Sequence, residues 1–408
     1  APVDFDALLA TFDQAARVAV DTAGPGYLAY IPGGGLVASA LAEMLARAVN
    51  RYTGIAAFAP ALVAMEESVL RWLCREFGLP AGAAGTVTTG GSLATLTAVV
   101  AAREDRLGER FADGVLYVTA QTHHCVAKAA RVAGLPPSRV RVVPTTADLR
   151  MDVGAAAAAI AADRAAGLRP FFIVGTAGAT NAGMVDPLAE LADLARRQEL
   201  WFHVDGAYGG CFQLTERGRA RLAGIEAADS IVIDPHKGLF LPYGTGVVLV
   251  RDGRTLRAAF AADAAYLQDI DDDRRLPDYA ALGPELTRDF RGLRLWLPLH
   301  LHGVAAFRAA LDEKLDLAQL AYEALAGDPL LETPWRPDLS TVVFRPHGDD
   351  ARAERLLARI NAAGPIFLAS TQIDGRRMIR FCVLSHRTHA AHVEQAIDII
   401  RRAAREIC

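Results

Sequence analysis

The stretch Ile231-Val-Ile-Asp-Pro-His-Lys237-Gly places a lysine directly after a short apolar run. The run is typical of a buried strand, and the carboxyl end of such a strand borders the crevice in which open α/β sheets bind ligands. A lysine buried there is expected to have a lowered pKa, and its neutral amine can attack an aldehyde. Considered alone, however, an exposed lysine at a strand end is the commoner situation.

Similar apolar runs alternate with helical stretches between about residues 85 and 250. Continuous apolar runs are typical of strands covered on both faces, and their alternation with helices predicts a mostly parallel α/β sheet. The runs lie at 115–118, 141–143, 171–174, 200–204, 231–233 and 246–250, and the helices near 60–78, 92–107, 123–133, 154–166 and 187–199.

A different pattern begins at about residue 300 and predicts a smaller C-terminal α+β domain. We therefore expect a large domain over 61–300 and a small one over 301–408. In the small domain, helices are expected near 303–327, 351–362 and 389–406, and strands near 341–345, 366–371 and 377–383.

The composition excludes several classes of protein. The 408 residues carry a net charge of -4, so no basic face for nucleic acid is expected. No apolar run reaches the ~20 residues of a membrane span. The five cysteines include no CxxC pair, which argues against disulfides and zinc and favours a cytoplasmic protein. The chain begins at Ala1 without a signal-peptide pattern, which is compatible with a native segment before it.

A carboxylate follows another predicted strand, in Trp201-Phe-His-Val-Asp205-Gly-Ala207. Asp205 could keep a pyridinium nitrogen protonated, as the electron sink of pyridoxal phosphate requires, while Ala207 packs flat on the ring. The alternative is an aspartate that caps a turn.

A phosphate site is predicted where Thr88-Thr-Gly90-Gly91-Ser92 precedes a helical run. Free backbone N–H groups, a hydroxyl and the helix dipole would meet there, although Ser92 could instead be a simple N-cap. His123 could stack on a cofactor ring, whereas a metal site is not expected from the adjacent His123 and His124. In chain order, these residues and Lys237 form the set that pyridoxal phosphate needs.

The chain resembles the group II pyridoxal-phosphate-dependent decarboxylases, the family of aromatic L-amino-acid, glutamate and histidine decarboxylases. The most specific motifs are His203-Val-Asp205-Gly-Ala207-Tyr, Asp229-Ser230 and Asp234-Pro-His-Lys237. The resemblance implies an aspartate-aminotransferase-like fold (fold type I). It also implies a homodimer with active sites at the subunit interface, in which residues 1–60 contribute to dimerisation and substrate access.

By matching positions, the resemblance makes Lys237 the Schiff-base lysine and assigns catalytic roles also to His123, Asp205 and Tyr266. Tyr266 stands 29 residues beyond the lysine, where aromatic decarboxylases carry the tyrosine that protonates the substrate carbon. A phenylalanine at this position accompanies aldehyde formation in related plant enzymes, so Tyr266 favours simple decarboxylation. The implied cofactor-binding residues are Gly91, Ser92, His123, Thr180, Asp205, Ala207, His236 and Lys237.

Two departures from the family pattern stand out. Asp234 occupies a position that is often asparagine in the animal enzymes, and an acid beside a phosphate is unfavourable unless it points elsewhere. Gly33-Gly-Gly35 replaces larger side chains on the substrate side, which leaves the substrate's size open.

The leading hypothesis is decarboxylation of an L-amino acid, first an aromatic one, to the amine and CO2. Acidic amino acids are an alternative, because Arg288 and Arg291 could bind a second carboxylate. Other reactions of the same cofactor are oxidative deamination to an aldehyde and transamination. A non-catalytic protein that binds pyridoxal phosphate is the alternative from a different class.

Overall fold

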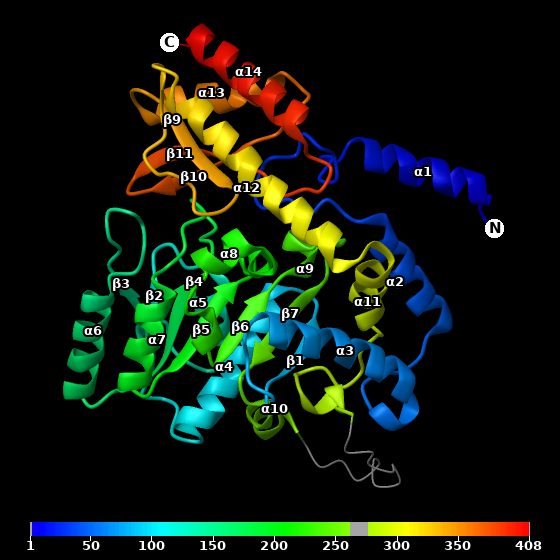
Figure 1. Ribbon diagram of the computed structural model, residues 1–408, viewed down its shortest axis with the longest axis vertical. Helices are drawn as coiled ribbons and strands as arrows, with labels where there is room; N and C mark the ends of the chain where they lie inside the picture. The colour runs from blue at the N-terminus through cyan, green and yellow to red at the C-terminus, as the bar shows by residue number, and fades with distance from the viewer. Residues whose placement is uncertain (1, 262–275, 408) are drawn as a thin grey trace.

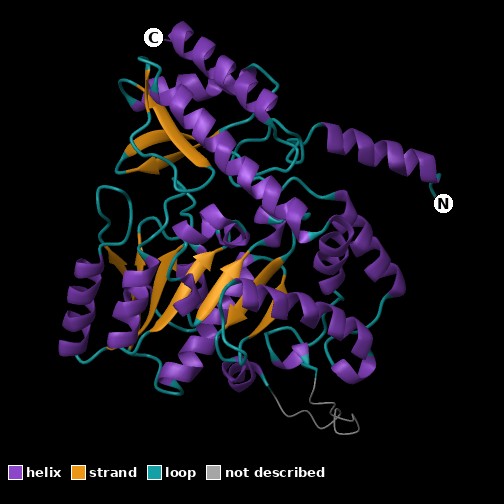
Figure 2. Cartoon of the chain, in the orientation of Figure 1, coloured by secondary structure: helices purple, strands orange, loops and turns teal. Residues whose placement is uncertain are grey.

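The computed structural model describes residues 2–261 and 276–407. Its larger part is built on a seven-stranded sheet with strand order β1-β7-β6-β5-β4-β2-β3 (Figures 1 and 2). Only β7 runs against its neighbours, so the sheet is mostly parallel, as predicted. The strands are β1 Ala84–Thr88, β2 Gly114–Thr119, β3 Val140–Val143, β4 Arg169–Thr176, β5 Trp201–Gly206, β6 Ser230–Ile233 and β7 Gly246–Val250.

Burial explains the continuous apolar runs of the central strands. Every residue of β2, β5, β6 and β7 is buried, because helices cover the sheet on both faces. The helices of this part are α3 Pro60–Glu76, α4 Gly91–Leu107, α5 Cys125–Val132, α6 Val153–Ala165, α7 Leu188–Arg197, α8 Glu216–Arg221, α9 Pro235–Gly238, α10 Gly253–Phe260 and α11 Gly292–His302.

A sharp turn separates β6 from α9 and sets the position of Lys237. Asp234 occupies the N-cap position of the short helix without a side-chain capping bond, and Pro235 opens the helix with the fixed φ that suits a first helical turn. Gly238 ends it against the Cys211 side chain, where a Cβ atom would come within 2.4 Å. Lys237 therefore leaves the carboxyl end of a buried strand, as the sequence predicted.

The smaller C-terminal part contains an antiparallel sheet with strand order β10-β11-β9-β8. The long helix α12 runs diagonally from the large sheet to this one (Figure 1). The boundary expected at residues 300 and 301 falls inside α11, just before α12 begins. The elements are α12 Val304–Ala326, β8 Leu331–Glu332, β9 Thr341–Pro346, α13 Asp350–Ala362, β10 Ala369–Ile373, β11 Arg376–Cys382 and α14 Ala390–Ile407.

Two N-terminal helices lie outside the sheet layers. Helix α1, Phe5–Arg17, has no buried residue and projects from the body (Figure 1). Helix α2, Val37–Val49, packs against α11 with a narrow face formed by Ala38, Ser39 and Ala42. Within the described residues, no helix is long and apolar enough to cross a membrane.

Candidate active site

A cavity of about 290 Å³ lies at the carboxyl ends of β4, β5 and β6. All eight residues expected to bind the cofactor line it, although they come from segments far apart in the sequence. Tyr266 lies outside the described residues. The lining residues are Thr89, Gly90, Gly91, Ser92, Leu93, His123, Cys125, Thr176, Gly178, Thr180, Asp205, Ala207, Tyr208, Asp234, His236 and Lys237.

The turn between β1 and α4 forms one wall of this cavity. No side chain caps the first turn of α4, a helix of 17 residues, so Ser92 is not an N-cap. The backbone N–H groups of Gly91 and Ser92 are therefore available for an anion. The turn is tightly backed: a Cβ atom at Gly91 would lie 2.9 Å from the Asp234 Oδ2 atom, and one at Gly246 only 2.4 Å from the Gly90 carbonyl carbon.

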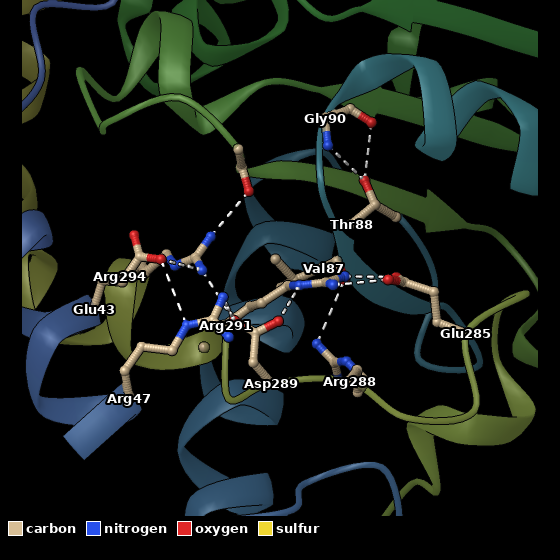
Figure 3. Close-up of polar contacts among 12 residues, drawn as sticks. Glu43, Arg47, Val87, Thr88, Gly90, Glu285, Arg288, Asp289, Arg291 and Arg294 are labelled. Atoms are coloured by element: carbon tan, nitrogen blue, oxygen red, sulfur yellow. Dashed lines mark hydrogen bonds and ion pairs between the residues drawn. The ribbon is translucent and has the colours of Figure 1, made fainter. Parts of the chain in front are cut away.

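Three arginines support this turn from behind (Figure 3). Arg288 and Arg291 each donate to the Val87 carbonyl at 3.4 Å, and Arg294 donates to the Gly244 carbonyl at 3.0 Å. Their charges are neutralised by the protein's own carboxylates on Glu43, Glu66, Glu285 and Asp289.

The expectation that Arg288 and Arg291 meet a substrate carboxylate is therefore wrong. Both are buried, and neither lines the cavity. Arg288 is paired with Glu66, and Arg291 is paired with Glu285 at 2.6 Å.

Asp205 lies near the end of β5 and is almost completely buried. Its Oδ1 atom accepts a hydrogen bond from the Ala207 N–H at 3.1 Å. The carboxylate thus caps the turn after β5 while it also faces the cavity. Asp205 can therefore cap this turn and also serve as the partner of a pyridinium nitrogen in the cavity.

His123 follows β2 and is held in one tautomer. The Cys125 N–H donates to its Nδ1 atom at 3.3 Å, which assigns the proton of the neutral ring to Nε2. Burial lowers the pKa of His123, so the neutral ring is favoured near pH 7. No group of metal-binding side chains occurs among the described residues, where His123 and His124 lie with ring centroids 4.2 Å apart.

Lys237 is paired with Asp234, whose Oδ2 atom lies 2.9 Å from the lysine Nζ atom. Burial disfavours the ammonium, but attraction to Asp234 outweighs it, so the pKa of Lys237 is raised. The expected lowering of this pKa is therefore wrong, because burial was considered without a counter-ion. Next to the lysine, the His236 Nδ1 atom donates to the Thr245 carbonyl at 2.7 Å.

Some lining residues were not predicted. Thr176 ends β4, and its buried hydroxyl has no hydrogen-bond partner within residues 2–261 and 276–407. The apolar run at 171–174 pointed to this strand end, but not to its polar side chain. Tyr208 is the last residue of the Asp205 motif but was given no role, and its hydroxyl lies 2.8 Å from the Ser340 Oγ atom of the smaller part.

The residues present fit pyridoxal phosphate. A glycine cradle with free N–H groups suits the phosphate, Asp205 suits the ring nitrogen, and Lys237 supplies an amine in the same cavity. The fold and this combination of groups define a pyridoxal-phosphate enzyme of fold type I.

Comparison with known proteins identifies the family. Residues 2–347 match the pyridoxal-dependent decarboxylase conserved domain. The chain is 34% identical over 394 residues to an aromatic-L-amino-acid decarboxylase of Bacillus atrophaeus, an alignment that covers 94% of this chain and 82% of that protein. The chain belongs to this family and is a pyridoxal-phosphate-dependent amino-acid decarboxylase.

Solved structures agree with this assignment. The structure of Oryza sativa TDC with PLP and tryptamine matches with a TM-score of 0.95 at 28% identity, covering 100% of this chain and 89% of that chain. Rhodiola rosea 4-hydroxyphenylacetaldehyde synthase matches with a TM-score of 0.92 at 26% identity and the same coverage of both chains.

Proposed function

We propose that this enzyme converts an aromatic L-amino acid into the corresponding amine and CO2. The observation that carries the proposal is the convergence of all eight expected cofactor residues on one cavity. Bound pyridoxal phosphate supplies the electron sink for cleavage of the bond to the carboxyl group.

The residues of the chain divide the work as follows. Lys237 would hold the cofactor covalently through its side-chain amine, which lies in the same cavity. Asp205 stabilises the protonated ring nitrogen, and the turn at Gly91 and Ser92 binds the phosphate. His123 lines the cavity and would pack against the ring of the cofactor, with its Nε2–H group available to donate a hydrogen bond to the reactants.

Tyr266 is proposed to protonate the substrate carbon after CO2 has left. This role rests on its position 29 residues after Lys237. Replacement by phenylalanine should divert the reaction toward an aldehyde, with O2 consumed and ammonia and hydrogen peroxide released.

An aromatic substrate is favoured over an acidic one. An acidic side chain needs a cation, and no arginine is among the described residues that line the cavity. The similar decarboxylase of Bacillus atrophaeus is named for aromatic amino acids, and the Oryza sativa structure holds tryptamine.

Product analysis tests the proposal. The enzyme, loaded with pyridoxal phosphate, is incubated with each of the common amino acids, and CO2, amine, ammonia, aldehyde, peroxide and keto acid are measured. Equal amounts of CO2 and amine from an aromatic amino acid support the proposal. Keto acid without CO2 would instead identify an aminotransferase, and a protein that binds the cofactor without any turnover would be non-catalytic.

An aldehyde synthase is the second candidate, because the synthase of Rhodiola rosea shares this fold closely. The same incubation separates the two activities. Aldehyde and peroxide in place of amine would assign this chain to the oxidative reaction.

We also propose that the enzyme is a homodimer. Helix α1 presents an apolar stripe of Phe5, Leu8, Leu9 and Phe12, and none of these side chains is buried. Helix α2 adds a second stripe, formed by Val37, Leu41, Met44 and Leu45, which are each about half exposed. A second copy that exchanges these helices would bury both stripes. Light scattering after gel filtration measures the oligomeric state.

A cytoplasmic location is proposed on the basis of cysteine chemistry. Cys74, Cys125, Cys211 and Cys382 are all buried free thiols, as expected in a reducing compartment. Cell fractionation with an antibody against the chain tests this location.

A further inference from the structure

Asp234 is buried, and its carboxylate faces the cavity. The side chain is 3% exposed, and the Oδ2 atom lies 2.9 Å from the Lys237 Nζ atom. The Oδ1 atom is also buried and has no hydrogen-bond partner in the described part of the chain. Lys237 is therefore the principal partner of this carboxylate.

The carboxylate lies between Lys237 and the phosphate turn. Its Oδ2 atom is 3.6 Å from the His236 Nε2 atom and 2.9 Å from the position of a Cβ atom at Gly91. The acid was expected to be unfavourable beside a phosphate unless it pointed elsewhere. The contact with Lys237 gives it another partner.

Other titratable groups also act on Lys237. Asp205 on β5 and Cys125 on α5 favour the ammonium, although more weakly than Asp234. His123 before α5 and Cys211 after β5 also interact with the lysine charge. Among residues 2–261 and 276–407, Asp234 is the one carboxylate in direct contact with the Nζ atom.

We propose that Asp234 is a positioning residue that holds free Lys237 as an ammonium ion and thereby restrains its reaction with an aldehyde. This inference rests on the proposed role of Lys237. The ammonium must first lose a proton to solvent. The neutral nitrogen then adds to the aldehyde carbon, and a water molecule leaves as the C=N bond forms. Asp234 acts on the first of these steps.

The same contact would operate in each turnover. When the substrate amine replaces Lys237, the released lysine needs a fixed position near the reacting atoms. An ion pair with the buried Asp234 carboxylate provides that position. The pair is held together because separating its members would leave a buried charge without a counter-ion. Asparagine at position 234 would keep the shape but not the charge.

The test follows the capture of free pyridoxal, which lacks the phosphate, by the full chain after its cofactor has been removed. Absorbance reports Schiff-base formation in a stopped-flow instrument from about pH 6 to about pH 10. In Asp234→Asn, each unit by which the Lys237 pKa falls should raise the neutral fraction and the capture rate near neutral pH about tenfold. The midpoint of the rate against pH should move to lower pH.

Asp193→Asn is the matched control. It removes an exposed carboxylate from an ion pair with Arg196, a pair with the same three-residue spacing and a distance of 2.7 Å. Its profile of capture rate against pH should coincide with that of the unchanged chain. If Asp234→Asn does not fold, Asp234→Ser removes the same charge, and the same shift is expected.

Superimposable profiles for the unchanged chain and the Asp234 variant would overturn the inference. An acceleration seen with pyridoxal phosphate but absent with pyridoxal would also overturn it, because Asp234 would then act on the phosphate. Lys237→Ala distinguishes failure of the proposed function: capture at an unchanged rate in this variant would mean that another amine reacts.

Discussion

The Nη2 atom of Arg288 lies 2.6 Å from the Oε1 atom of Glu66, and neither side chain is more than 2% exposed. The other oxygen of Glu66 accepts from the Gly292 N–H at 3.0 Å. The Arg288 guanidinium also lies over the Tyr279 ring, 4.5 Å from its centroid. Glu66 therefore ties α3 to the start of α11 and to Arg288, which supports the phosphate turn through the Val87 carbonyl.

Arg288→Met should destabilise the fold strongly, because it leaves the Glu66 carboxylate buried without its cation. The loss of one partner of a buried pair costs about 3–5 kcal/mol. Urea unfolding measures the change, and adding Glu66→Gln should recover part of it. Arg254→Met, which breaks an exposed pair with Asp252, is the control and should change little. An equally small loss of unfolding free energy in Arg288→Met and Arg254→Met would contradict the structural role of Arg288.

Gly91→Ala should weaken cofactor binding more than it weakens the fold. The new methyl group would lie 2.9 Å from the Asp234 Oδ2 atom and 3.3 Å from the Ala207 Cβ atom, so the phosphate turn must shift. We expect the dissociation constant of pyridoxal phosphate to rise about tenfold, which corresponds to about 1.4 kcal/mol. Fluorescence titration measures it.

Gly82→Ala is the control for this substitution. A Cβ atom at Gly82 meets nothing within 4 Å, and its backbone does not require glycine. Equal cofactor affinity in the two variants would show that the Gly91 turn is not the phosphate site.

The sequence predicted the large sheet well, because strands covered on both faces must be apolar at every position. The expected helix at 92–107 differs from α4 by one residue at its start. Strand β1 was not predicted, since Thr86 and Thr88 are polar but buried and interrupt its apolar pattern.

The members of the site were also predictable, but their charge interactions were only partly so. Glu66 is 222 residues from Arg288, and no local sequence pattern predicts that pair. In contrast, Asp234 lies only three residues from Lys237. That spacing places two side chains on one face of a helical turn and could have indicated their contact.

Leu41→Glu should convert the proposed dimer into monomers. Leu41 is 51% exposed on the α2 stripe, outside the buried face formed by Ala38, Ser39 and Ala42, so the charge would disrupt an interface without entering the core. Light scattering should show the mass halved at micromolar concentration. Leu320→Glu, at an exposed apolar position on α12, should leave the mass unchanged. A dimer that survives Leu41→Glu would locate the interface elsewhere.

His203 should make the stability of the fold depend on pH. It is completely buried on β5, its Nδ1 atom lies 2.8 Å from the Ser230 Oγ atom, and burial lowers its pKa to about 4. The Trp201 Nε1–H donates to the same hydroxyl at 2.7 Å, and burial favours the neutral His203 ring.

Because this folded-state pKa lies below the ordinary histidine pKa of 6.5, the unfolded chain binds more protons between these two values. The stabilisation is therefore complete above about pH 6.5 and is lost as the pH falls toward about 4. The glutamine in His203→Gln does not titrate. The difference in the free energy of unfolding between the unchanged chain and this variant, called the deficit, should therefore shrink by on the order of 3 kcal/mol over this range. Urea unfolding at each pH measures the deficit. A deficit for His203→Gln that does not change with pH would mean that His203 is not held neutral by burial.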